Sequence, residues 1–384
     1  MLLIKNGTLH DGKRGVHPQT DILIKDGLIN TIDSSLEAPD ARVIDAGGKH
    51  VFPGFINAIS TWGAYGPAWD DNDVKEATDP VMPELNVVFA FDHDSMVFQE
   101  AFKYGVTAAG VAPDPSAVLG GQAAVFKTYG RSPYKMLVRE KAAQVASVTA
   151  APKEHYGKKQ LMPMTKMGTF SLLSQALRKA SIYDPGKEDA SYDSKSDALL
   201  PVLSGDTPLF VNCSTKAEMD GIERVLSPYP EIRLVYTGAY MIDADRENVK
   251  SKKCQVILGD MTEAIKDDSS RVDYAGVKAL IDGGADIAAS CCGDYLAGGK
   301  ENLLWNAMLL YKHGIDSETV LSMITSTPAK ILGVEELIGS LETGKHADFS
   351  IWTDNPIERF TARLESVYIR GENLLEKERY VSCW

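Results

Sequence analysis

Two adjacent cysteines, Cys291 and Cys292, stand at the end of a predicted strand and are followed closely by Asp294. A thiol acts as a nucleophile in its thiolate form, which needs a neighbouring base or a positive potential. None of the seven histidines can be assigned to that role from its place in the chain. We therefore interpret both cysteines as small buried residues, and we keep Cys292 and Asp294 as candidates for relocated catalytic chemistry.

Neutral polar residues stand at the ends of two further predicted strands. Asn212 and Ser214 end the strand near residues 208–213, and Thr237 follows the strand at residues 232–236. In a barrel these three side chains would surround one mouth. Amide and hydroxyl groups there can bind a polar ligand or ordered water, but they do not hold a divalent metal tightly.

Four larger side chains could line a pocket at that mouth. Trp69 belongs to a long irregular segment at residues 64–94, and Trp62 stands just before it. Both either wall a ligand site or pack in the core. Lys127 and Lys166 either neutralise an acidic ligand or form structural ion pairs.

The same long segment contains several acidic residues and a histidine. The carboxylates could bind a cation, although we favour solvation, and the loop histidines His93 and His155 are also interpreted as solvated. The acidic residues are Asp70, Asp71, Asp73 and Asp94.

The composition excludes several function classes. The chain has 384 residues, 44% of them hydrophobic, which is enough for one large and one small domain. Its net charge is −13 and no basic cluster is present, so we expect no nucleic-acid partner. No run approaches about 18 apolar residues, and no signal peptide is indicated, so we expect no membrane association. The five cysteines show no CxxC spacing, which favours a reducing, cytoplasmic location.

Short apolar strands alternate with helical stretches through the middle of the chain. With one further strand assumed, this pattern predicts an α/β fold with a (β/α)8 TIM-like barrel over residues 53–335. An open doubly wound sheet is the alternative, although no GxGxxG follows a strand. Gly120-Gly121-Gln122 is interpreted as a turn. The predicted strands are Val51–Asn57, Val106–Ala112, Val145–Ala150, Pro208–Cys213, Ile232–Tyr236, Cys254–Leu258 and Asp286–Ser290.

Both ends of the chain have β-hairpin patterns. Asn6-Gly7 and Asp26-Gly27, next to apolar runs, indicate tight hairpin turns, because both central residues of such a turn need a positive φ. Similar strand patterns recur after Ala347. We therefore expect one small composite β-domain, built from residues 1–52 plus 336–384.

The segment Val43–Gly63 (VIDAGGKHVFPGFINAISTWG) resembles the start of the amidohydrolase superfamily barrel. Thr325–Gly333 and Ile338–Trp352 resemble the C-terminal motifs of the same superfamily. The resemblance implies a barrel with a composite β-sandwich domain, and one or two divalent metals such as zinc as the usual cofactors. Four inner segments are similar to the imidazolonepropionase-like branch: Asp79–Pro83, Gly105–Thr107, Gly120–Thr128 and Pro163–Gly168.

In that superfamily, histidines and a few charged residues at the carboxyl ends of the barrel strands hold the metals. By resemblance, the corresponding positions here carry other residue types, so we expect no metal cofactor. The first strand, for example, has Ile59 and Thr61 in place of the usual His-x-His pair. The vacated positions are Ile59, Thr61, Ala150, Asn212, Ser214, Thr237 and Cys292.

The resemblance and its missing ligands predict an amidohydrolase-family protein that has lost its metal centre. Such a protein would bind a small polar ligand without catalysis, or act as a partner subunit, in a homo-oligomer or with an active paralogue. One alternative is a hydrolase of C–N bonds, non-peptide or dipeptide, with relocated or metal-independent catalytic residues. Another is a purely structural assembly subunit.

Overall fold

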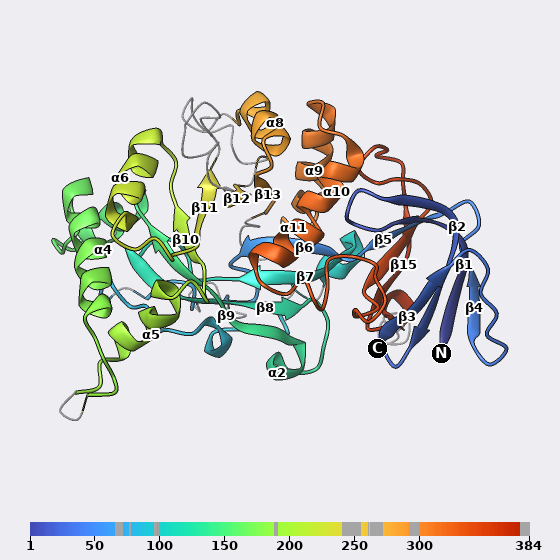
Figure 1. Cartoon of the computed structure of the whole chain (residues 1–384), viewed down its shortest axis with the longest axis horizontal. Coiled ribbons are helices and arrows are strands. Elements are labelled where there is room, and N and C mark those ends of the chain that lie inside the picture. The colour runs from blue at the N-terminus through green and yellow to red at the C-terminus, as the bar shows by residue number, and fades with distance from the viewer. Residues whose placement is uncertain are drawn as a thin grey trace.

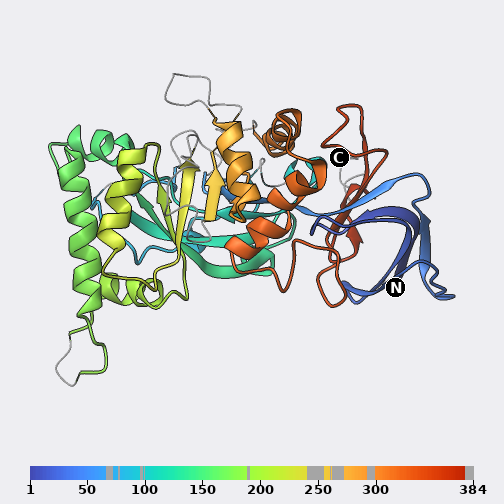
Figure 2. The ribbon, with the colours of Figure 1, turned by 45° about the horizontal axis from the view of Figure 1, so that its top comes forward.

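The computed structural model describes residues 1–65, 72–76, 78–95, 98, 100–187, 191–239, 255–259, 261, 272–291 and 299–376. The described chain forms two units that lie side by side along the longest axis (Figure 1). The smaller, β-rich unit contains both the first and the last described strands, and the larger unit holds a second sheet with most of the helices. In Figure 2, α4 (Lys166–Ser181) lies at the end of the molecule farthest from the smaller unit.

The smaller unit is an eight-stranded sheet in the order β16-β15-β14-β5-β1-β2-β3, with β4 paired to β1. Antiparallel pairing of β14 with β5 joins the C-terminal strands to the N-terminal ones. Both ends of the chain therefore build this unit, whereas its β-sandwich arrangement stays a prediction. The strands are β1 Leu2–His10, β2 Val16–Lys25, β3 Leu28–Asp33, β4 Arg42–Asp45, β5 His50–Pro53, β14 Phe349–Trp352, β15 Leu364–Ile369 and β16 Glu372–Asn373.

The two predicted hairpin turns of this sheet have different outcomes. Asp26 and Gly27, with φ values of 53° and 79°, connect β2 to β3, so this turn is confirmed. The turn predicted at Asn6-Gly7 is wrong, because both residues lie inside β1. The pairing of β1 with β2 shifts between Ile4 and Gly7, and a bulge of this kind accommodates the positive φ of Asn6.

The larger sheet has the order β13-β12-β11-β10-β9-β8-β7-β6 and forms a nearly closed barrel in a mixed α/β fold. β6 is parallel to β7, and β9 to β13 are parallel to one another. β8 is antiparallel to both of its neighbours, so the mostly parallel sheet departs from the regular (β/α)8 pattern at this strand. The strands are β6 Phe55–Ser60, β7 Val106–Val111, β8 Leu119–Lys127, β9 Leu137–Ser147, β10 Leu209–Asn212, β11 Leu234–Ala239, β12 Gln255–Leu258 and β13 Asp286–Ala288.

The prediction of a turn at Gly120-Gly121-Gln122 is also wrong, because these residues begin β8. All the residues of β8 are buried. A Cβ on Gly121 would lie 2.7 Å from the carbonyl oxygen of Leu85. Gly121 therefore permits a close approach between β8 and a neighbouring loop, which is a recognised use of glycine inside a strand.

The barrel sheet has two different faces. On the inner face, alternate residues of the strands form one apolar cluster, to which α11 (Ser326–Ile331) contributes. The outer face packs against the surrounding helices in a larger core (Figure 1). None of the helices in the described part of the chain is long and apolar enough to cross a membrane. The other helices are η1 Val87–Phe89, η2 Ala101–Tyr104, α2 Pro133–Met136, α3 Ala150–Gly157, α5 Ser194–Leu203, α6 Lys216–Leu226, α8 Tyr274–Asp282, α9 Asn302–Lys312 and α10 Ser317–Met323.

Candidate functional site

Three polar residues lie next to one another at the carboxyl ends of β9, β10 and β11. Asn212 in β10 is the Cα partner of Ser147 in β9 and of Thr237 in β11. Ser147 and Thr237 are buried and Asn212 is half-buried. The parallel register thus brings together two residues expected from the sequence, Asn212 and Thr237, with Ser147, which sequence reasoning missed.

The hydrogen bonds of this row involve neutral groups. Asn212 Nδ2 donates to the carbonyl oxygen of Thr237 at 3.5 Å, and the amide of Val148 donates to the carbonyl oxygen of Asn212 at 3.1 Å. The hydroxyl oxygens of Ser147 and Thr149 lie 3.0 Å apart. These side chains offer donors and acceptors without formal charge, which suits a polar ligand or water better than a divalent cation.

The barrel strand that was expected to reach Ala150 ends earlier in the chain. β9 ends at Ser147, and Ala150 is the first residue of α3, so the predicted strand Val145–Ala150 is too long. The hydroxyl of Thr149 accepts from the amide of Ala151 at 3.3 Å and caps this helix. A threonine N-cap is a recognisable helix start, and it could have placed the strand end at Ser147.

The first barrel strand places Ile59 on the inner face of the barrel, where it packs against the apolar cluster. The pairing of β6 with β7 shifts between Asn57 and Ser60, and Ala58 and Ile59 both contact this cluster. A β-bulge explains how consecutive side chains reach the same face. Thr61 follows β6, and its carbonyl oxygen accepts from Ala64 at 3.1 Å.

Ser214 and Lys166 both meet the buried carboxylate of Glu218. The amide of Ser214 donates to Glu218 Oε2 at 2.8 Å, and Lys166 Nζ lies 2.9 Å from Glu218 Oε1. Glu218 also completes a capping box with Thr215 at the start of α6. Of the two alternatives for Lys166, the structure shows the ion pair, which links α4 to α6.

Lys127 and Trp62 are both buried. Lys127, the last residue of β8, is 2% exposed, and its ammonium group pairs with Asp348 of the smaller unit. Asp348 Oδ1 also accepts from the amide of Arg370 at 2.9 Å. Lys127 therefore joins the two units. Trp62 is 2% exposed and packs in the larger core.

The two histidines considered for the mouth have different surroundings. His155 lies in α3, so its prediction as a loop residue is wrong. Burial first, and then the charges of Lys159 and Lys75, lower the pKa of His155. His93 stays in the long loop, where its Nε2 lies 3.7 Å from a carboxylate oxygen of Asp94.

Several expected site residues lie outside the described part of the chain, and their predicted roles stay predictions. They are Trp69, Asp70, Asp71, Cys292 and Asp294. The neighbouring Cys291 is described and is buried.

The metal centre of the superfamily does not fit the strand-end residues that are described. Isoleucine has no donor atom, and the hydroxyl and amide groups of the row are weak ligands for zinc. Among the described residues, one group could bring three donor atoms within 4.8 Å of one another, namely Asp92, His93 and Asp94. These are consecutive loop residues, and the side chain of Asp94 is 71% exposed, so the group lacks the buried support of a usual metal site.

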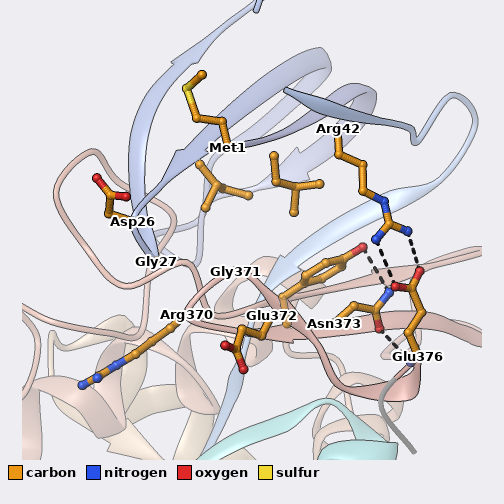
Figure 3. A pocket seen from close by; sticks show the side chains of 12 residues that line it. Met1, Asp26, Gly27, Arg42, Arg370, Gly371, Glu372, Asn373 and Glu376 are labelled. Atoms are coloured by element: carbon orange, nitrogen blue, oxygen red, sulfur yellow. Dashed lines mark hydrogen bonds and ion pairs between the residues drawn. The ribbon is translucent and has the colours of Figure 1, made fainter. Parts of the chain in front are cut away.

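Two cavities are relevant to ligand binding. One, of about 400 Å³, lies between the loop after β6 and the start of β8. The other, of about 440 Å³, lies in the smaller unit (Figure 3). There Arg42 donates to both carboxylate oxygens of Glu376, at 3.0 and 2.6 Å. The guanidinium charge of Arg42 is therefore already paired within the protein.

The fold is similar to that of known amidohydrolase barrels. Residues 216–374 match the model of the amidohydrolase family. An amidohydrolase from Thermotoga maritima MSB8 has a TM-score of 0.88 and 26% identity, covering 97% of this chain and 99% of that one. A zinc-bound adenosine deaminase from Xanthomonas campestris has a TM-score of 0.57 and 15% identity over 97% of this chain and 92% of that one, and shows the fold alone. The match to the family model thus covers residues 216–374, and the described chain has a fold similar to that of the Thermotoga maritima amidohydrolase.

The curated relatives match only parts of their own length. A dihydroorotase of Thermoanaerobacter sp. (strain X514) is 48% identical over 56 residues, which is 15% of this chain and 13% of the relative. Amidohydrolase tasK of Hapsidospora irregularis is 22% identical, covering 88% of this chain and 38% of the relative. Their reactions are therefore not transferred to this chain.

Proposed function

We propose that this amidohydrolase-like protein has no catalytic metal centre and binds a small polar ligand at the carboxyl ends of its barrel strands. We also propose that it belongs to the imidazolonepropionase-like branch of the superfamily. Its proposed location is the cytoplasm. The observation that carries the proposal is the row Ser147, Asn212 and Thr237, which has neutral side chains at the carboxyl ends of three neighbouring barrel strands.

Ile59 on the first barrel strand also supports the absence of a metal site, because its alkyl side chain has no ligand atom and packs on the apolar inner face. A bound water next to such groups would keep its ordinary pKa, since no cation lowers it. Hydrogen bonding and shape would then determine ligand choice, and binding would not lead to hydrolysis.

An activity panel tests this proposal. The purified protein would be assayed with a cyclic amide, a dipeptide and a lactone, each with added zinc or manganese and with a chelator. We expect no turnover above the buffer rate in any condition. Metal-dependent turnover that is lost in an Asn212→Ala variant would contradict the proposal.

The partner role is a second part of the same proposal. A protein that keeps the fold without the metal could regulate an active paralogue or form a homo-oligomer. Native mass spectrometry of the protein, alone and with cell extract, distinguishes these forms by mass.

The second candidate function is hydrolysis of a C–N bond with relocated catalytic residues. The favouring observation is that the similar solved structures include hydrolases, among them a molinate hydrolase and a phenylurea hydrolase B, at 15% and 14% identity. This candidate predicts turnover that is abolished by Cys292→Ala or Asp294→Asn. Absence of turnover across the panel would count against it.

A further inference from the structure

The cavity beside β8, which we call the side cavity, is built from two segments on the functional face of the barrel. One is the loop after β6, at residues 72–90, and the other is the connection from β7 to β8, at residues 113–121. The amide of Asp114 donates to the carbonyl oxygen of Val74 at 3.0 Å and ties these segments together. The volume of about 400 Å³ lies in the range of small-molecule sites.

The side cavity adjoins the strand-end row. The amide of Ser147 donates to the carbonyl oxygen of Val118 at 3.1 Å, only two residues before Gly120 in the cavity wall. The cavity and the row therefore lie at the same end of the barrel.

The ionisable residues of the cavity wall carry a net negative charge. Asp73, Glu76 and Asp114 line the cavity together with one cation, Lys75. The Nζ atom of Lys75 lies 3.4 Å from Asp114 Oδ2. The lysine therefore balances one of the three carboxylates. Asp73 is exposed and lines the cavity, so its carboxylate is accessible.

Two buried glutamines add hydrogen-bond acceptors behind the same wall. Gln144 is fully buried, and its Nε2 donates to the carbonyl oxygens of Gly120 and Gly121, the latter at 3.3 Å. Gln122 is 5% exposed, and its Nε2 donates to the carbonyl oxygen of Pro83 at 3.2 Å. The Oε1 atoms of both glutamines have no partner within the described residues. A buried acceptor without a donor is unfavourable, so an ordered water beside these atoms would be stabilised, whereas neither glutamine lines the cavity itself.

The rest of the wall is apolar and partly open. Phe89 is 83% exposed and Leu85 is 40% exposed, and both line the cavity with the buried Met82. An exposed phenylalanine next to carboxylates offers an apolar contact and a face for a cation. The wall thus combines negative charge with an apolar surface.

We propose that the side cavity binds a small organic cation, namely a primary amine that carries an aromatic or apolar group. The ammonium group lies at the carboxylates, near Asp73, and its apolar part packs on Phe89 and Leu85. This inference rests on the proposed ligand-binding function and names the class of ligand.

The test compares three probes of similar shape: 2-phenylethylamine, 2-phenylethanol and 3-phenylpropanoate, which are a cation, a neutral alcohol and an anion. Isothermal titration calorimetry or ligand-observed NMR with the full chain measures their binding. We expect a dissociation constant of about 1 mM or tighter for the amine, and weaker binding for the alcohol and the anion. Higher salt would weaken binding of the amine.

Two variants locate the site. Asp73→Asn should weaken amine binding about fivefold, whereas Glu37→Gln, at an exposed position of the smaller unit, should leave it unchanged. Equal binding of the three probes, no amine binding at millimolar concentration, or an unaffected Asp73→Asn variant would overturn the inference. Failure of the proposed function is recognised separately, as metal-dependent turnover, which probe binding does not measure.

Discussion

The side-chain amide of Asn57 holds both polar groups of the Cys291 backbone. Asn57 Oδ1 accepts from the amide of Cys291 at 3.0 Å, and Asn57 Nδ2 donates to its carbonyl oxygen at 2.9 Å. Asn57 lies in β6, and Cys291 follows β13, so this contact connects the two edge strands of the barrel sheet. The amide of Ile56 adds a bond to the carbonyl oxygen of Ile324 at 2.7 Å. The side chain of Asn57 thus holds the two edge strands of the barrel sheet, β6 and β13, near each other. The segment after α10 is bound to β6 as well.

Replacing Asn57 should therefore destabilise the whole barrel. Asn57→Ala would leave a buried amide and a buried carbonyl without their partners, which we expect to cost about 2–5 kcal/mol. Urea unfolding followed by circular dichroism measures this change. Asn212→Ala, which removes one 3.5 Å bond at a half-buried position, should cost less than about 1 kcal/mol. Equal losses in the two variants would show that Asn57 has no special role in closure.

The buried pair of Lys127 and Asp348 predicts a second effect on stability. Lys127→Met leaves the Asp348 carboxylate buried without its cation, which should cost about 3–5 kcal/mol. Adding Asp348→Asn should recover much of that loss, because an uncharged amide can still accept from Arg370. The free energies of unfolding of the two single variants and the double variant form a cycle. Additive losses would contradict direct coupling of the pair.

The same junction of the two units predicts sensitivity to acid. Burial first, and then the charges of Lys127 and Arg370, lower the pKa of His346 from its usual 6.5 to about 4. A lowered pKa means that the folded state favours the neutral imidazole. Its contribution to stability is present above pH 6.5 and is lost as the pH falls to about 4.

The melting temperature measured across this range tests the effect. His346→Gln should flatten the decline of the melting temperature relative to the unmodified protein. His17→Gln is the matched control, because the side chain of His17 is 54% exposed. A remaining slope is expected, since burial also lowers the pKa values of His50 and His155. An unchanged slope in His346→Gln would contradict the assignment.

Restoring the missing ligands tests whether the vacated positions face one another. Asn212 and Thr237 are in register on neighbouring strands, Ile59 is the penultimate residue of β6, and Thr61 follows that strand. A variant with histidine at all four positions should retain about one zinc ion per chain after dialysis. The pair Ile59→His and Thr61→His alone should retain much less. No retained zinc in a folded four-histidine variant would show that the positions do not form a common site.

Local chemistry explains which parts of this structure could be predicted from the sequence. The Asp26-Gly27 hairpin was predictable because both residues must adopt positive φ. The proximity of Asn212 and Thr237 could be predicted because the carboxyl ends of parallel strands lie at the same edge of a sheet. The strand β8 could not be predicted, because its glycines are typical of a turn. The role of Gly121 in the close approach to Leu85 is visible only once the neighbouring loop is folded against the strand.

The contact that closes the barrel could not be predicted from the sequence. Asn57 stands at an ordinary strand position, and its partner Cys291 is 234 residues away. Ser147 was missed for a local reason, since the cap at Thr149 shortens the strand that was expected to reach Ala150. The side cavity depends on two loops, and strand and helix patterns do not predict how loops pack.

The metal content of the purified native protein tests the central claim most directly. The protein would be prepared without a chelator, dialysed, and analysed by inductively coupled plasma mass spectrometry for zinc, manganese, iron, cobalt and nickel. We predict less than about 0.1 ion of each per chain, because the described strand-end side chains are neutral or apolar. A variant with Asp92→Asn, His93→Gln and Asp94→Asn distinguishes an ion held by that loop. About one or two ions per chain that remain in this variant would contradict the account.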